Sequence, residues 1–344
     1  MRETFRAWQE QFETFALEVI FNERRGKRAT ALRGLLFCLS KVFLAGVKGR
    51  RWLYEARIIR DHPLGVQVIT VGNLTVGGTG KTPLVIALVQ AAVARGLKVA
   101  VVSRGFGGKI DQYPCLVTAD SDALDVGDEP VLIARRTGVP VILDPDRRNA
   151  LDVAIRDHAP DLVISDDGLQ HYALPRSAEI VVVDGQRGLG NGRCLPEGPL
   201  REPATRLKEV DFVVSTGGGW SGAHPMIMRP ADITSLATGE TLDHQTFLRE
   251  HPQVHAVAGI GNPKRFFNLL SILGLSATPH VFPDHHAFQP ADLAFADGLP
   301  VLMTEKDAVK CAPFAEPHWW YLPVTASLPD GLLEQMLDRA LGKE

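Results

Sequence analysis

A glycine-rich loop between an apolar strand and a helix constrains this 344-residue chain more than any other feature. Gln67–Val71 has the β-branched composition of a buried strand, and the segment 72–82 that follows reads GNLTVGGTGKT and opens a helical pattern at Lys81. Triphosphate binding needs unobstructed backbone N–H groups, a lysine, a hydroxyl for Mg²⁺ and a helix N-terminus. The loop supplies all four, so it predicts a nucleotide phosphate site.

Within this loop, Lys81 is expected to contact the β- and γ-phosphates and to act in catalysis, and the Thr82 hydroxyl to bind Mg²⁺. The general pattern G-x-x-x-x-G-K-[ST] has glycine where Thr75 stands, so the backbone must follow a different route there. A ligand-free glycine turn is the alternative, and we favour ATP binding. The residues expected around the ATP phosphates are Thr75, Val76, Gly77, Gly78, Thr79, Gly80, Lys81 and Thr82.

The strand, loop and helix pattern repeats along the chain. Further β-branched runs lie at 98–102, 139–143, 161–165, 179–184 and 211–215, with a helical pattern at 147–158. Such runs separated by helices predict an α/β fold of the P-loop NTPase-like type, with a mostly parallel sheet flanked by helices. A glycine cluster at 217–219 then breaks the pattern, and new strands at 255–259 and 300–304 indicate a second, smaller α/β domain. We expect a core domain at 61–220 and the smaller domain at 221–344.

Residues 1–60 differ from the rest of the chain. Between Arg24 and Arg60 there are eleven Lys or Arg residues and one acid, Glu55. The apolar stretch 34–47 is interrupted by Lys41 and is shorter than the ~20 residues of a membrane-spanning helix. A basic amphipathic segment that lies on an anionic membrane surface fits this pattern. A helix that caps the core and has a solvated basic flank is the alternative.

Net charge and cysteine spacing argue against a nucleic-acid-binding, zinc-binding or disulfide-rich protein. A net charge of −3 gives no basic field for nucleic acid. Four widely spaced cysteines argue against a zinc site or disulfide framework and favour a reducing, cytosolic compartment. No feature points to an obligate protein partner.

Acidic residues stand where strands should end. Asp166 and Asp167 follow the run 161–165, at the strand end that faces the ligand crevice of an open α/β sheet, and they predict a Mg²⁺ site. An Asp-Gly turn would explain only one of the two acids. Asp128, beside Glu129, is either a helix N-cap or a base for an attacking hydroxyl. His285 could orient an aspartate across a domain cleft, or be structural.

The sequence resembles the tetraacyldisaccharide 4′-kinase (lipid A 4′-kinase) family. Seven stretches carry the resemblance, in order along most of the chain: 71–83 (VGNLTVGGTGKTP), 103–108 (SRGFGG), 127–130 (GDEP), 166–171 (DDGLQH), 195–202 (LPEGPLRE), 259–267 (GIGNPKRFF) and 303–310 (MTEKDAVK). The resemblance implies transfer of phosphate from ATP, with Mg²⁺, to the 4′-hydroxyl of a tetraacylated disaccharide 1-phosphate. It also implies a kinase core on which the smaller domain closes, at the cytoplasmic face of the bacterial inner membrane. In this family Thr75 belongs to the loop itself.

The resemblance also assigns roles to residues. Asp128 would be the catalytic base and His285 its partner. Mg²⁺ would be held by Thr82, Asp166 and Asp167, and Glu202 would be a further acid at the metal or substrate. Arg104 and Arg201 would meet phosphate charge, and Glu129 and His171 are further substrate candidates.

Three other functions remain as alternatives. A P-loop GTPase or metallochaperone ATPase should carry an Asn-Lys-x-Asp motif, and the nearest run, 304–307 (TEKD), lacks the Asn. A nucleotide-gated membrane adaptor would leave Asp128 and His285 without a task. A dinucleotide-binding protein would use 259–262 (GIGN), which lacks the third glycine of that motif.

Overall fold

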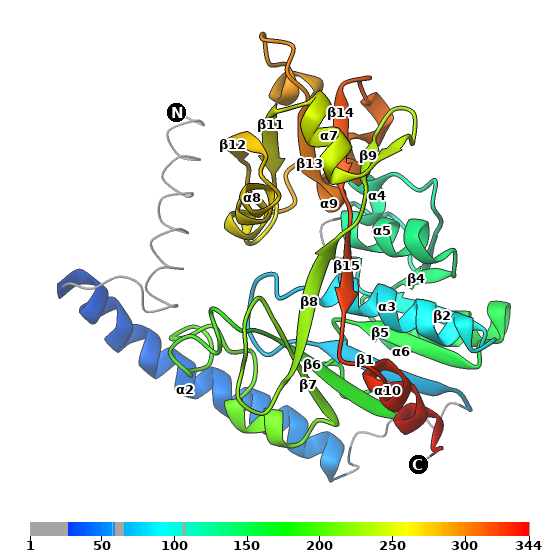
Figure 1. Cartoon of the computed structure of the whole chain (residues 1–344). Helices are drawn as coiled ribbons and strands as arrows, with labels where there is room; N and C mark the ends of the chain where they lie inside the picture. Colours follow the sequence, from blue (N-terminus) through cyan, green and yellow to red (C-terminus); the bar gives the residue numbers. More distant parts are fainter. Residues whose placement is uncertain (1–26, 57, 59–64, 106–107, 344) are drawn as a thin grey trace.

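Two β-sheets with helices packed on them organise the chain (Figure 1). The computed structural model describes residues 27–56, 58, 65–105 and 108–343, and of residues 27–33 only the helical backbone. The structure therefore has the predicted α/β architecture with two sheets.

The first sheet has nine strands in the order β15-β8-β7-β6-β1-β5-β2-β4-β3. All neighbours pair in parallel except the two edge strands β15 and β3. The strands are β1 (Gln67–Gly72), β2 (Val99–Ser103), β3 (Cys115–Val117), β4 (Val141–Leu143), β5 (Leu162–Asp166), β6 (Ala178–Asp184), β7 (Phe212–Thr216), β8 (His224–Pro230) and β15 (Val324–Ser327). The register places Val71 of β1 beside Asp166 of β5, so the expected phosphate loop and the expected metal acids leave the sheet at the same edge.

Both faces of this sheet are buried, as the continuous apolar runs require. On one face Ile69 and Val71 pack with α3, α5 and α10, and on the other Val68 and Ala100 pack with α6. Alternate residues of one strand thus enter different clusters, because side chains alternate across a sheet. The helices are α3 (Lys81–Ala94), α4 (Ala123–Val126), α5 (Asp128–Thr137), α6 (Arg147–His158) and α10 (Leu332–Leu341).

The second sheet has six strands in the order β10-β9-β14-β13-β11-β12. Its strands are β9 (Ile233–Ser235), β10 (Thr241–Leu242), β11 (Gln253–Ala258), β12 (Ser276–Val281), β13 (Val301–Thr304) and β14 (Trp319–Leu322), and its helices are α7 (His244–Glu250), α8 (Pro263–Ile272) and α9 (Glu305–Cys311). Phe247, Phe266 and Trp320 lie in its core. Helix α9 packs beside α5, so the second sheet meets the first close to Asp128.

The chain reaches the second sheet through β8 and returns through β15, and these two strands run side by side between the sheets (Figure 1). After β15, Leu332, Met336 and Leu337 of α10 join the core over α3. The sequence prediction placed residues 221–344 in the smaller domain. The structure instead places β8, β15 and α10 with the first sheet, because pairing between distant strands leaves no mark in the local sequence pattern.

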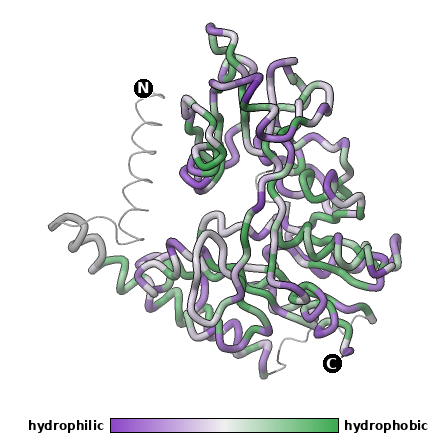
Figure 2. Tube along the Cα trace, viewed as in Figure 1, coloured by the Kyte–Doolittle hydropathy of each residue, from purple (hydrophilic) through white to green (hydrophobic). Residues whose placement is uncertain are grey.

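Helix α2 (Lys27–Glu55) contains the described part of the predicted basic segment; residues 1–26, 57 and 59–60 of that segment lie outside the described residues. The mostly apolar stretch 34–47 is followed by the basic stretch 48–51, and both apolar and polar residues are seen along the helix (Figure 2). One face rests on the protein: the Ser40 hydroxyl donates to the Cys194 carbonyl at 2.8 Å, and Phe43 and Leu44 pack on a buried cluster. Of the helices that the structure describes, none has the length and apolar character needed to cross a bilayer.

Candidate active site

The glycine-rich loop connects β1 to α3 and is held by its neighbours. The Thr216 hydroxyl donates to the Thr79 carbonyl at 2.9 Å, and the Asn73 amide donates to the Gly77 carbonyl at 3.2 Å. Gly80 begins α3 with a left-handed φ of 88°, which glycine adopts without strain. Thr75, which stands where the general pattern has glycine, forms a β-bridge with Leu200.

Lys81, in the first turn of α3, lies beside an acid that follows β5. Its Nζ is 3.3 Å from Asp167 Oδ1, and Arg201 Nη1 donates to both oxygens of the same carboxylate at 3.0 Å. Burial alone would raise the pKa of Asp167, but Lys81 and Arg201 lower it to about 2. Asp167 is therefore fully ionised at neutral pH and bound to two cations.

Asp166, the last residue of β5, has the opposite electrostatic environment. It is 2% exposed, and burial together with the nearby Glu129 raises its pKa to about 7. Ser103 donates to Oδ2 only at 3.5 Å, and Oδ1 has no hydrogen-bond partner among the described residues. A buried carboxylate with an unsatisfied oxygen needs either a proton or a cation.

These features fit Mg²⁺. Within the described ranges no three His, Cys, Asp or Glu side chains converge into a closed metal cage. Mg²⁺ at phosphoryl-transfer sites is instead held by one or two carboxylates, a P-loop hydroxyl, phosphate oxygens and water. Asp166, with its unpartnered oxygen, has the chemistry for such an open donor set, and Asp167 beside it and Thr82 in the first turn of α3 are the other predicted members.

Asp128 joins the two sheets. It is the first residue of α5 and is 3% exposed, and His285, which follows β12, places Nδ1 3.1 and 3.2 Å from its two carboxylate oxygens. Burial would raise the pKa of Asp128, but the hydrogen bond from His285 and the charges of Lys306 and Lys310 lower it. Gly127, not Asp128, occupies the N-cap, so the capping alternative for Asp128 is wrong.

His285 is held in an uncommon conformation. Its φ is 59°, a left-handed value that few residues other than glycine adopt and that often marks a functional site. The hydrogen bond with Asp128 raises the pKa of His285. The neighbouring His286 instead lies 3.0 Å from Asp292, in a separate pair.

Two lysines of α9, for which the sequence predicted no role, lie beside Asp128. Lys306 Nζ lies 3.1 Å from Glu129 Oε1 and 3.8 Å from Asp128, and Lys310 Nζ lies 3.8 Å from the other Asp128 oxygen. Burial would lower the pKa of Lys306, but Glu129, Asp128 and Asp284 raise it. The signal in the sequence was their spacing of four residues, which places two cations on one face of a helix.

The remaining predicted residues lie around the loop. Glu202 accepts from Gln170 at 2.9 Å and from Tyr172 at 2.7 Å, one bond to each of its oxygens, so it belongs to a hydrogen-bonded network. Gln170 also donates to the Asn73 carbonyl at the start of the loop. Burial and the charges of nearby arginines lower the pKa of His171 to about 4. Arg104 is exposed at the end of β2.

Another cation that sequence reasoning missed is Arg147, at the start of α6. It is 1% exposed and donates to the Asp144 carbonyl at 3.0 Å. Burial lowers its pKa to about 10, against the opposing charges of Asp166 and Asp167. A fully buried guanidinium gives no local sequence signal, because Asp146-Arg147-Arg148 looks like an ordinary exposed helix start.

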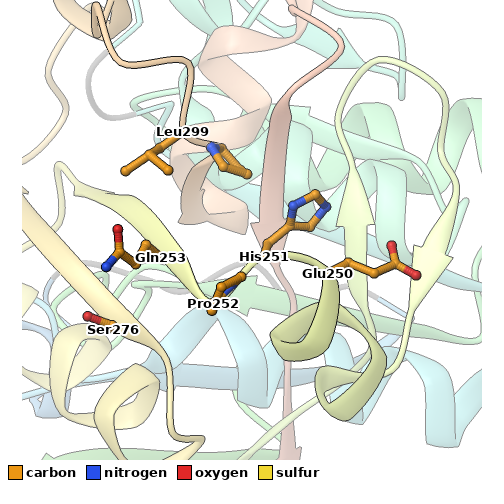
Figure 3. Close-up of a pocket in the computed structure, with 7 residues that line it drawn as sticks. Glu250, His251, Pro252, Gln253, Ser276 and Leu299 are labelled. Carbon is orange, nitrogen blue, oxygen red and sulfur yellow. The ribbon is translucent and has the colours of Figure 1, made fainter.

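A cavity of about 480 Å³ lies elsewhere, between Glu250–Gln253, Ser276 and Leu299–Pro300 (Figure 3). These residues precede or open β11, β12 and β13, so the cavity is at the amino ends of the second sheet. Ligand crevices of α/β sheets lie at the carboxyl ends, where Asp128, Lys81 and Asp166 are. The cavity is therefore separate from the candidate site.

The chain is similar to known proteins over most of its length. The sequence profile of the LpxK family, described as tetraacyldisaccharide-1-P 4′-kinase, matches residues 32–342. The tetraacyldisaccharide 4′-kinase of Alcanivorax borkumensis is 81% identical over 301 residues, which cover 88% of this chain and 92% of that protein. The enzyme of the same name from Nitrosococcus oceani is 49% identical over 305 residues, which cover 89% of this chain and 90% of that protein.

The fold has a solved counterpart. The crystal structure of LpxK from Aquifex aeolicus, in complex with ATP, superimposes with a TM-score of 0.73 at 26% identity, and covers 91% of this chain and 99% of that one. Sequence and fold comparisons thus agree over most of the chain. On this evidence the chain belongs to the tetraacyldisaccharide-1-P 4′-kinase family.

Proposed function

We propose how this chain carries out the reaction of its family, the ATP-dependent phosphorylation of tetraacyldisaccharide 1-phosphate at its 4′-hydroxyl to form lipid IVA in lipid A biosynthesis. The ATP triphosphate lies in the loop 72–82, with backbone N–H groups and Lys81 on its phosphates. Lys81 then exchanges part of its contact with Asp167, 3.3 Å away, for the γ-phosphate. Arg201 keeps Asp167 neutralised during this exchange.

Mg²⁺ would be held by Asp166, Asp167 and Thr82, and when bound it would neutralise charge on the β- and γ-phosphates. The unpartnered oxygen of Asp166 supports this assignment. Glu202, fixed by Gln170 and Tyr172, holds the start of the loop through the Gln170 contact with the Asn73 carbonyl.

Asp128 accepts the proton of the 4′-hydroxyl. His285 and the two lysines of α9 keep its carboxylate ionised, so it is a weak base. A weak base is sufficient because phosphoryl transfer has a loose transition state and depends mainly on positioning and charge neutralisation. His285 comes from the second sheet, so we infer that this sheet must close on the first for the base to be oriented.

The enzyme meets its lipid at an anionic membrane surface, which we place at the cytoplasmic face of the inner membrane. Helix α2 exposes Leu35, Leu39 and Val42 at helical spacing, on a face other than the one that rests on the protein through Ser40 and Phe43. A helix that only capped the core would bury its apolar residues on one face. Exposed Lys41, Lys48 and Arg50 add attraction to anionic lipid.

The contact between His285 and Asp128 carries the mechanistic proposal, and Asp128→Asn tests it. We expect kcat for transfer of labelled phosphate from ATP to the disaccharide lipid to fall at least about 100-fold, as for loss of a general base, with ATP binding retained. Asp292→Asn is the matched control, because Asp292 pairs with His286 at 3.0 Å outside the site. Normal turnover in Asp128→Asn would remove Asp128 from the mechanism.

A further inference from the structure

An arginine of the second sheet's α8 reaches the carboxyl edge of the first sheet. Arg265 Nη2 donates to Asp184 Oδ2 at 3.0 Å, at the end of β6, and Nη1 donates to Thr216 Oγ1 at 3.4 Å, at the end of β7. Asp184 is 2% exposed and Thr216 is fully buried. The guanidinium therefore joins one sheet to polar groups buried in the other.

A glycine, Gly217, leaves the space that the Arg265 guanidinium occupies. Gly217 has φ of 68°, and a Cβ on it would lie 2.6 Å from Arg265 Nη2. Any larger residue would displace the guanidinium as well as strain the backbone. A second arginine connects the two sheets from the other side: Arg187, which follows β6 of the first sheet, donates through Nη2 to the carbonyl of Gly261, just before α8, at 3.2 Å.

Thr216 connects Arg265 to the phosphate loop by hydrogen bonds to both. A threonine hydroxyl has one hydrogen and accepts through its lone pairs, so Thr216 accepts from Arg265 while it donates to the Thr79 carbonyl at 2.9 Å. A cationic donor polarises the hydroxyl and strengthens the bond that the hydroxyl donates. The peptide between Thr79 and Gly80 is planar, so a fixed Thr79 carbonyl also fixes the direction of the Gly80 N–H on its opposite side.

We propose that Arg265 is a positioning residue for the phosphate loop. Through Thr216 it aligns the Thr79–Gly80 peptide for the triphosphate, and so makes ATP binding depend on the docking of α8 against β6 and β7. This inference rests on the phosphate-binding role proposed above for the loop. Arg265 thus acts through Thr216 and is not proposed as a catalytic residue.

Three variants test the relay: Arg265→Ala, Thr216→Val and the double variant. Each should weaken binding of a fluorescent ATP analogue and raise the KM for ATP about tenfold, the effect of losing one charge-assisted hydrogen bond. The KM for the disaccharide lipid should stay unchanged. The double variant should bind ATP no more weakly than Arg265→Ala alone, because both substitutions break one chain of contacts.

Lys264→Ala is the control, since Lys264 is the exposed neighbour of Arg265 on the same helix and should leave all constants unchanged. Thr216→Val is nearly isosteric and keeps the Arg265–Asp184 ion pair, so it tests the relay even if Arg265→Ala fails to fold. Unchanged ATP binding in Thr216→Val would overturn the inference, as would additive effects in the double variant. Lys81→Ala separates the two proposals: if it also leaves ATP binding intact, the loop assignment itself fails.

Discussion

Three aspartates of the candidate site differ in pKa because their neighbours differ. Two cations lower the pKa of Asp167 to about 2, burial beside Glu129 raises that of Asp166 to about 7, and His285 lowers that of Asp128. Perturbations of this kind concentrate at functional sites. The sequence predicted all three acids, since each stands at a strand or helix end, but it gave no means to rank their pKa values.

The His285–Asp128 contact should make stability depend on pH. The pKa of His285 is raised above its ordinary value of 6.5, so the folded state binds this proton more tightly than the unfolded state. The stabilisation is fully present below pH 6.5 and is lost as pH rises through the higher folded pKa. Denaturant unfolding across this window should show a smaller loss of stability in His285→Gln than in the wild type.

His286→Gln serves as the control for that measurement, because its partner Asp292 lies outside the site. Equal pH dependence in the wild type and in His285→Gln would show that this histidine has no raised pKa.

At the scale of elements, one part of α2 contacts residues next to the candidate active site, and another part is exposed to solvent. Tyr54 of α2 lies 5.9 Å from Tyr172, ring centre to ring centre, and Tyr172 donates to Glu202. Arg51 forms an ion pair with Glu209, just after the short 3₁₀ turn Ala204–Lys208. The basic and apolar composition of α2 was readable from the sequence. Its contacts were not, because they join residues more than a hundred positions apart.

The exposed apolar face of α2 should provide membrane binding. We expect the double variant Leu35→Ser, Leu39→Ser to lose most of its sedimentation with vesicles of phosphatidylethanolamine and phosphatidylglycerol, with ATP binding unchanged. Leu116→Ser is the matched control, since Leu116 is 49% exposed on β3 and Leu39 is 48% exposed on α2. Equal partition of the double variant and the wild type would contradict the membrane role.

For the whole molecule, local pattern predicted many of the strands of the first sheet, and long-range pairing decided the arrangement of the elements. The strands β1, β2, β5, β6 and β7 and the phosphate loop lie where the sequence placed them. The return of β15 and α10 to the first sheet, the two lysines beside Asp128 and the reach of Arg265 were not predicted. Each of these features depends on contacts between segments that are far apart in the sequence, such as the contact between Asp128 and His285, which are 157 positions apart. Local periodicity carries no information about such contacts.

The last helix should be required for the stability of the first sheet. Met336 of α10 is fully buried in the same cluster as Leu84 and Leu88 of α3. Met336→Ala should lower the free energy of unfolding by about 2–5 kcal/mol, the usual cost of such a cavity. Gln335→Ala, on the exposed face of α10, should change it by less than ~0.5 kcal/mol in denaturant titrations. Equal values for both variants would refute this packing role.

The return of residues 324–341 to the first sheet also has a consequence for biosynthesis. The ribosome translates α2 and the phosphate loop before the second sheet, yet the edge strand and the helix that complete the first sheet are translated only after it. Until then the apolar surface of α3 that α10 covers in the folded protein remains exposed in the nascent polypeptide. With α2 as the proposed membrane contact, a growing chain can therefore reach the lipid surface before it is able to fold into a working enzyme.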